Sequence, residues 1–385
     1  MDINCDSHIS TSHSTSDFFE SNTNSTRTLA SIQVIEKVEK HINADALELA
    51  TILGWQIVTR TGEVTPGAKV IYCEIDSMLP VDAPWLPSAI KNRITKEQTI
   101  DFFRIKTIKL RGELSQGLIV PIVDTLPNSG EVNSWNELEV GYDVTELLDL
   151  QKYEPPAFTG KFAVYGAVSG NTSNFPTKFV NKTDEPRVQS NPKLFASLQW
   201  KPYYMTVKLD GTSATYFLDP ATGELVVCSR NMIRKKPDNL SSEIHDVINC
   251  PYWYIAEKYD IENKLRTVPH LALQGEVCGP NIQRNLLGLK DLELFIFNIV
   301  DIRDRSRLSF NDMIATCNEV LSVSHVPIEE TGDQFNYETI NSLLGKAAGT
   351  YKGTKSAREG LVIRATNQSI SFKAINNEYL LKYGY

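Results

Sequence analysis

Lys208 is the residue of this chain that is best placed to act as a nucleophile. It ends an apolar run over residues 203–207 and precedes Leu209, Asp210 and Gly211. Burial of an ammonium group without a partner is costly, so a lysine at the end of a buried strand has a lowered pKa and can attack an electrophile. The alternative is a surface lysine in front of an ordinary Asp-Gly hairpin turn. Lys208 alone leaves both interpretations open.

Five further segments with reactive residue types follow Lys208 in sequence order. Two bring a basic residue, two bring a glutamate close to a glycine, and one, over 294–300, is an apolar run with aromatic residues at alternate positions. Side chains two residues apart share one face of a strand, so an aromatic ring there can stack on a base. The charged and aromatic candidates are Arg230, Glu276, Phe295, Phe297, Glu359 and Lys373.

This ordered set resembles the covalent nucleotidyltransferase superfamily of nucleic-acid ligases and mRNA-capping enzymes. The superfamily's motifs run K-x-D-G, an arginine-bearing turn, an E-x-x-G strand, an aromatic strand, E-G-[LV]-V-[IL]-[KR] and a final lysine motif. The resemblance covers nearly all of residues 175–382. It implies that Lys208 attacks the α-phosphorus of a nucleoside triphosphate and forms a lysyl-nucleotide phosphoramidate.

The resemblance also implies a role for each of the other groups. Lys373 and Arg230 would stabilise the charge that the α-phosphate gains in the transition state. Oxygen ligands for Mg²⁺ or Mn²⁺, direct or through water, would come from Asp210, Glu276 and Glu359. The nucleotide would also lie against Gly211, the glycine of the first motif, and against one aromatic ring. We favour Phe297 slightly over Phe295 as that ring.

Each of these residues also has a purely structural interpretation. Glu276 could pair with a surface lysine, Arg230 could be a solvated turn residue, and Lys373 could end a strand. The two phenylalanines could belong only to the core. Because all of the motifs occur in the expected order, the catalytic interpretation is favoured over a separate structural role for each residue.

The N-terminal part has a different pattern. Short apolar segments with turn signals between them, from residue 31 to about 122, predict a small β-barrel that resembles an OB-fold. Residues 41–48 also resemble the opening of tRNA-binding OB modules. We therefore expect an α+β chain with a disordered tail (1–28), an OB-like β-barrel domain (29–150), a linker (151–165) and a catalytic domain (166–385), which by the resemblance has ATP-grasp-like antiparallel sheets plus helices.

The domain order selects among relatives. DNA ligases and capping enzymes carry an OB domain after the final lysine motif, whereas only residues 374–385 follow Lys373 here. The arrangement resembles RNA ligases of the Naegleria and Deinococcus type. Residues 181–189 look like their K-T-D-E-x-R-[IV]-Q segment, and 371–382 look like their C-terminal strand. This resemblance implies that Arg187 contacts the nucleotide or the substrate phosphates.

One position departs from the pattern of many ligases. They have a second lysine two positions after the first in the last motif, where this chain has Ile375. The α-phosphate contact is thereby left to Lys373, with or without another cation. In the N-terminal part, Lys106, Lys109 and Arg111 alternate along an expected strand, which indicates either a solvated face or a contact with the RNA backbone.

The implied reaction consumes ATP and joins RNA. Lys208 takes AMP and releases pyrophosphate, AMP passes to a 5′-phosphate RNA end, and a 3′-hydroxyl then expels it. RNA, as a nicked duplex or paired ends, is thus the expected partner, and a monomer is the expected state. Alternatives are a capping-type guanylyltransferase, a DNA ligase, and a non-catalytic tRNA- or RNA-binding protein.

The composition limits the class of protein. Of 385 residues, 41% are hydrophobic and 22% charged, as in ordinary globular proteins. The net charge of −8 means that a nucleic-acid site must be a local basic patch. Six widely spaced cysteines indicate neither a zinc site nor a disulfide framework. With neither a signal-peptide pattern nor a transmembrane-length apolar run, we expect an intracellular protein and no membrane partner.

Overall fold

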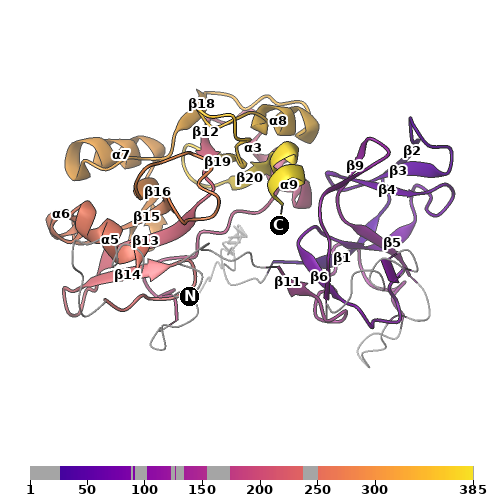
Figure 1. Cartoon of the computed structure of the whole chain (residues 1–385), viewed down its shortest axis with the longest axis horizontal. Coiled ribbons are helices and arrows are strands. Elements are labelled where there is room, and N and C mark those ends of the chain that lie inside the picture. The colour runs from indigo at the N-terminus through magenta and orange to yellow at the C-terminus, as the bar shows by residue number, and fades with distance from the viewer. Residues whose placement is uncertain are drawn as a thin grey trace, which may run out of the picture.

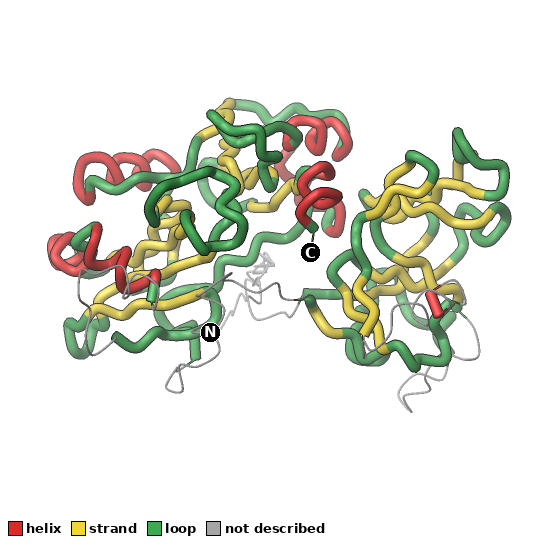
Figure 2. Tube along the Cα trace, in the orientation of Figure 1, coloured by secondary structure: helices red, strands yellow, loops and turns green. Residues whose placement is uncertain are grey.

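The computed structural model describes residues 27–87, 90–91, 102–122, 126, 134–153, 174–236 and 250–384. These residues form an N-terminal β-rich part and a C-terminal part of sheets and helices, which confirms the expected α+β class (Figures 1 and 2). The expected tail lies outside the described residues except for Arg27 and Thr28, which bond to Glu74 and Asp143. Most of the expected linker also lies outside them.

The N-terminal part consists of short antiparallel strands arranged in small sheets. The strand orders are β1-β5-β10, β2-β3-β4, β11-β6-β7 and β8-β9. These sheets surround a common core. The strands are β1 (Ala30–Val34), β2 (Lys37–Lys40), β3 (Leu47–Ile52), β4 (Trp55–Arg60), β5 (Lys69–Cys73), β6 (Ser77–Pro80), β7 (Phe102–Arg104), β8 (Ile108–Leu110), β9 (Glu113–Ser115), β10 (Leu118–Pro121) and β11 (Gln151–Lys152).

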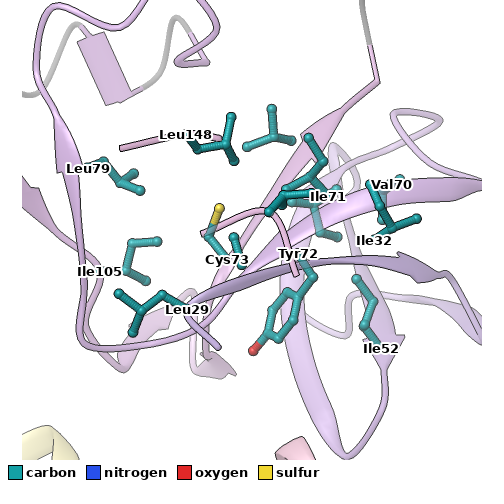
Figure 3. Close-up of a cluster of buried hydrophobic side chains, with 14 of the residues drawn as sticks. Leu29, Ile32, Ile52, Val70, Ile71, Tyr72, Cys73, Leu79, Ile105 and Leu148 are labelled. Atoms are coloured by element: carbon teal, nitrogen blue, oxygen red, sulfur yellow. The ribbon is translucent and has the colours of Figure 1, made fainter. Parts of the chain in front are cut away.

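The core of this part is built from inward-facing side chains of several sheets. Figure 3 shows Ile32, Ile52 and Ile71 together with Tyr72, whose hydroxyl donates to the carbonyl of Gln116 at 2.9 Å. The four side chains are fully buried. Burial of a large apolar side chain contributes about 2–3 kcal/mol, so this cluster holds the small sheets to one another.

The C-terminal part contains two antiparallel sheets. One has the order β18-β12-β19-β20, and the other has the order β14-β13-β15-β16-β17. The strands are β12 (Tyr203–Lys208), β13 (Thr212–Leu218), β14 (Leu225–Ser229), β15 (Leu271–Cys278), β16 (Glu293–Asp301), β17 (Ser306–Arg307), β18 (Ile328–Gly332), β19 (Gly360–Ala365) and β20 (Ser371–Ile375). The chain passes from the first sheet to the second directly after Lys208, at Leu209-Asp210-Gly211.

Helices pack against both sheets. Tyr252 and Ile255 of α5 and Leu265 of α6 share a core with Leu273 of β15 on the five-stranded sheet. Leu343 of α8 packs in the core of the four-stranded sheet. The helices are α3 (Pro192–Leu198), α5 (Pro251–Lys258), α6 (Ile261–Thr267), α7 (Phe310–Ala315), α8 (Ile340–Ala347) and α9 (Asn377–Tyr383), with a 3-10 turn η1 (Val188–Ser190) and a π turn η2 (Thr316–Leu321) after α7.

The two parts contact each other through the β3–β4 turn. The Gly54 amide donates to the Gln189 carbonyl at 3.0 Å. A Cβ at position 54 would lie 2.8 Å from the Gln189 Cα, closer than real Cβ contacts, so the approach requires glycine. The N-terminal part is thereby docked on η1, directly after Arg187.

Candidate active site

A cavity of about 670 Å³ lies between the two sheets of the C-terminal part and is closed on one side by residues of the N-terminal part. All nine residues that the sequence assigned to nucleotide and metal chemistry line it. They are Arg187, Lys208, Asp210, Gly211, Arg230, Glu276, Phe297, Glu359 and Lys373.

Strand pairing brings Lys208 to Glu359. Lys208 is the last residue of β12 and pairs with Gly360, the first residue of β19, so Glu359 lies directly beside it. The Lys208 Nζ donates to the Glu359 Oε2 at 2.9 Å. The two side chains are 26% and 18% exposed, so the pair is open to the cavity.

The expected lowered pKa of Lys208 is wrong for the protein as it stands. Burial lowers the pKa of Lys208, but the nearby carboxylates of Glu359, Glu276 and Asp210 raise it above its ordinary value. Burial alone would lower this pKa, but the fold gathers three carboxylates around one ammonium group, and that number cannot be read from the sequence.

The same crowding raises the pKa values of two of the carboxylates. Burial, with Glu359 adding to it, raises the pKa of Asp210 to about 6. Burial is the main cause that raises the pKa of Glu276 to about 8. Glu359 and Asp210 add to this effect, and Lys208 only partly offsets it. Such a cluster is short of positive charge.

Gly211 is required for this crowding. A Cβ at this position would lie 2.4 Å from the Val277 carbonyl oxygen and 2.8 Å from the Glu276 Cγ. The turn after Lys208 therefore passes directly over β15, and no larger residue fits there.

The carboxylates fit a divalent cation. The Asp210 Oδ2 is buried and has no hydrogen-bond partner within the described part of the chain. A carboxylate oxygen of this kind is the ligand type that Mg²⁺ and Mn²⁺ prefer. Among the described residues, however, no three acidic, histidine or cysteine side chains are close enough to bind one ion together. A cation bound at the Asp210 Oδ2 would therefore keep most of its waters, with Glu276 and Glu359 close by.

Cationic side chains also line the cavity. Lys373 of β20 donates its backbone N–H to the Pro186 carbonyl at 2.8 Å, so Arg187 runs alongside it. Burial, with Lys208 and Arg187 nearby, lowers the pKa of Lys373 to about 7. Arg230 donates to Asp184 at 2.7 Å, and this arginine opposes the effect of burial and holds the pKa of Asp184 well below its usual range.

Phe297 forms the aromatic wall, and a buried ion pair fixes its strand. Of the two candidate phenylalanines, Phe297 lines the cavity and Phe295 does not. The guanidinium of Arg364 donates to the Phe297 carbonyl at 2.8 Å and to Glu185 at 2.9 Å. Both ionic side chains are less than 10% exposed.

Sequence reasoning missed the contribution of the N-terminal part to the cavity. Asp76, Arg104 and Tyr153 line it. Asp76 accepts from Arg187 at 2.7 Å and from Arg104 at 2.6 Å. Nothing in the local sequence marks these residues, because the ion pairs join segments that are far apart in the chain.

Two tyrosines beneath Lys208 were also missed. The Tyr351 hydroxyl donates to the Lys208 carbonyl and accepts from the Glu359 N–H, each at 3.1 Å. The Tyr379 hydroxyl donates to the Asp210 Oδ1 at 2.9 Å. An aromatic residue near the end of the last motif was visible in the sequence, but its partner was not.

The three basic residues of the N-terminal part lie elsewhere. Lys106, Lys109 and Arg111 are exposed and do not line the cavity. The single strand expected to carry them is divided into β7 and β8, and Arg111 lies in the β8–β9 turn with φ +51°. Turn geometry therefore replaces the predicted alternation along one strand.

The described cysteines lie inside the two parts of the chain. Cys73, Cys228, Cys250, Cys278 and Cys317 are all buried free thiols. In the described ranges, no helix combines the length and the apolar character that crossing a bilayer requires.

Comparison with known proteins identifies both parts. An OB-fold domain model matches residues 29–122, which confirms the predicted N-terminal fold. An RNA ligase model matches residues 201–383. A comparison with curated proteins finds no match.

Solved structures of Naegleria gruberi RNA ligase match almost the whole chain. An apo mutant has 32% sequence identity and a TM-score of 0.78 over 92% of this chain and 98% of that chain. A mutant with ATP and Mn has 32% identity and a TM-score of 0.78 over 93% and 100%. The ligase with PPi has 30% identity and a TM-score of 0.78 over 93% and 99%. At this identity and coverage, the chain belongs to the RNA ligase family.

Proposed function

We propose that this protein seals 3′-hydroxyl and 5′-phosphate RNA ends with ATP, through a lysyl-AMP intermediate on Lys208. The observation that carries the proposal is the meeting of Lys208, three carboxylates and two groups of cations in one cavity. Naegleria gruberi RNA ligase, which is similar along its whole length, has been solved with ATP and Mn and with AMP and Mn.

In the first step, the Lys208 Nζ attacks the α-phosphorus and pyrophosphate leaves. The amine must lose its proton first, and Glu359 accepts a hydrogen bond from it at 2.9 Å and can receive that proton. Mg²⁺ or Mn²⁺ held by Asp210, Glu276 and Glu359 would supply the positive charge that these carboxylates lack and would favour the neutral amine.

The other cations of the cavity bind the phosphates. Lys373 and Arg187 lie side by side, and we assign the α-phosphate to this pair, with Arg187 in the place of the lysine that Ile375 does not supply. The Nε and Nη1 atoms of Arg187 are buried without a partner among the described residues. These two donors can bind a phosphate without breaking a hydrogen bond that Arg187 already makes.

The second and third steps use the same cavity. A 5′-phosphate oxygen of RNA attacks the α-phosphorus of lysyl-AMP, and the Lys208 Nζ leaves and regains a proton. The 3′-hydroxyl then loses its proton to solvent and attacks the adenylated 5′-phosphorus, and AMP leaves. Lys373, Arg187 and Arg230 stabilise the phosphate charge in each step, and Phe297 stacks on the adenine throughout.

The exposed β8–β9 hairpin is the proposed contact with the RNA duplex. Lys109 and Arg111 project from it on the N-terminal domain, and Lys106 precedes it. Charges of this kind bind the backbone and not the sequence. We further propose that the protein acts as a monomer on a nicked duplex, and that a linker over residues 151–165 joins an N-terminal domain (29–150) to a catalytic domain (166–385).

Labelled nucleotide tests the proposal. Wild-type protein with Mn²⁺ should form a covalent adduct with α-labelled ATP and not with GTP, and Lys208→Ala should form none. Lys201→Ala, which removes an exposed lysine from the same region, should retain the adduct. A GMP adduct would indicate capping chemistry. Folded wild-type protein that forms no adduct would contradict the proposal.

A further inference from the structure

The C-terminal helix α9 reaches the turn that follows Lys208. Tyr379 of α9 is 7% exposed and donates its hydroxyl to the Asp210 Oδ1 at 2.9 Å, although the residues are 169 positions apart. The other carboxylate oxygen, Oδ2, is buried and has no partner within the described ranges. One oxygen of Asp210 is thus held by the helix, and the other is left to bind a cation.

The start of α9 is fixed to the two residues that precede β19, Arg358 and Glu359. The Asn376 N–H donates to the Glu359 carbonyl at 2.9 Å, and the Asn376 side-chain amide donates to the Arg358 carbonyl at 2.9 Å. The Asn376 Oδ1 in turn accepts from the Glu378 N–H and caps the helix. Asn376 is fully buried, so α9 cannot shift without breaking these bonds.

The opposite side of α9 contacts the N-terminal domain. The Gln116 Nε2 donates to the Asn377 Oδ1 at 3.1 Å. Leu380 packs against the hydrophobic core of that domain. Figure 1 shows α9 on the side of the catalytic domain that faces the N-terminal strands.

We propose that Tyr379 is a positioning residue for Asp210, and that α9 makes this positioning depend on the docking of the N-terminal domain. The hydroxyl fixes the rotation of the Asp210 carboxylate, so that Oδ2 is presented to the divalent cation. Gln116 and the core around Leu380 hold α9 in the place from which Tyr379 reaches Asp210. The inference rests on the proposed function, in which Asp210 binds that cation.

Direct Mn²⁺ binding by the apo protein tests the positioning, measured by the loss of the free Mn²⁺ signal in electron paramagnetic resonance. Tyr379→Phe keeps the ring and removes only the hydroxyl. It should weaken Mn²⁺ binding by roughly tenfold, the low end of the cost of removing an outer-shell hydrogen bond from a metal site. The Mn²⁺ concentration for half-maximal adenylylation should rise by the same factor, and the rate at saturating Mn²⁺ should change far less.

Tyr337→Phe is the matched control. Tyr337 also donates its hydroxyl to a carboxylate, that of Glu330, at 3.1 Å, but it does not line the cavity. Its removal should leave Mn²⁺ binding unchanged. Equal weakening in both variants would overturn the positioning role, as would unchanged Mn²⁺ binding in Tyr379→Phe.

The role of the N-terminal domain is tested by the same measurement of Mn²⁺ binding. Asn377→Ala removes the acceptor on α9 and leaves Gln116 its bond to Thr107 at 3.2 Å. Asn377→Ala should also weaken Mn²⁺ binding. The double variant with Tyr379→Phe should bind Mn²⁺ almost as well as Tyr379→Phe alone, because both changes act through the Tyr379 hydroxyl. Full additivity would overturn the coupling. If the wild type forms no AMP adduct, the proposed function fails, but the Mn²⁺ comparison still decides the role of Tyr379.

Discussion

Arg187 and Asp76 form an ion pair of 2.7 Å between the catalytic domain and the N-terminal domain, across 111 positions of the chain. Asp76 also accepts from Arg104 at 2.6 Å. Burial opposes the charge on Asp76, but the two arginines, with Arg187 first, lower the pKa of its carboxyl below the usual range. A candidate phosphate-binding arginine is therefore positioned by the other domain.

Asp76→Asn should destabilise the protein at neutral pH. Removal of one partner from a buried pair costs 3–5 kcal/mol, and we expect about 2 kcal/mol here because the pair is partly exposed. The lowered pKa means that this contribution is present above pH 4 and is lost as the pH falls through the folded pKa. Thermal unfolding at pH 7 and at pH 3.5 should show the difference in Tm shrinking at the lower pH.

Asp82→Asn is the control for that measurement, because Asp82 is an exposed carboxylate of the same domain. It should leave Tm unchanged at both values of pH. An Asp76→Asn variant that is as stable as the wild type at pH 7 would refute the structural role of the pair.

Glu276→Gln should stabilise the metal-free protein at alkaline pH. The folded pKa of Glu276, about 8, lies above its ordinary value of 4.5. The native state therefore binds the proton more tightly, and stability falls as the pH rises from 4.5 to 8. Glutamine avoids this loss, so Tm in EDTA should be about 2–4 °C higher than in the wild type at pH 8.5, the shift that about 1 kcal/mol produces in a domain of this size.

The gain from Glu276→Gln should vanish at pH 4.5, where the wild-type carboxyl is protonated. Glu338→Gln, at an exposed position, should give no gain at either pH. A gain that is independent of pH would mean that packing, and not the charge of Glu276, explains the difference.

Lys373 should make ATP binding depend on pH. Its pKa of about 7 means that it is charged below pH 7 and increasingly neutral above it. In EDTA, the affinity of the wild type for ATP should therefore fall by up to about tenfold per pH unit above pH 7.5. Lys373→Arg stays charged and should bind ATP with little change up to pH 9; a parallel fall in that variant would assign the effect to another group.

The sequence was most informative where neighbouring residues alone define the chemistry. The nine predicted nucleotide and metal residues all line the cavity. Lys208 ends β12 and Asp210 and Gly211 follow it in the turn, whereas Glu276, Phe297 and Lys373 lie inside strands. The sequence was least informative where long-range contacts decide. The pKa of Lys208 depends on how many carboxylates the fold gathers, and Asp76 and Tyr379 depend on which segments the two domains bring together.

The β8–β9 hairpin should affect RNA sealing and not adenylylation. Lys109→Ala and Arg111→Ala should weaken binding of a nicked RNA duplex, and each should reduce the slope of log K against log salt by roughly 0.7–0.9 if it removes one phosphate contact. Adduct formation without RNA should be unchanged. Lys264→Ala on α6, at the far end of the catalytic domain in Figure 1, should alter neither; an unchanged slope in the hairpin variants would place the RNA elsewhere.

The most direct test of the account is the sealing of four nicked duplexes that differ only in whether each side of the break is RNA or DNA. RNA is distinguished from DNA by its 2′-hydroxyls and A-form geometry. Wild-type protein with ATP and Mn²⁺ should seal the all-RNA nick at least roughly tenfold faster than the all-DNA nick, a difference of about 1.4 kcal/mol in the barrier, and Lys208→Ala should seal neither. Equal or faster sealing of the all-DNA nick, or sealing by Lys208→Ala, would contradict the account.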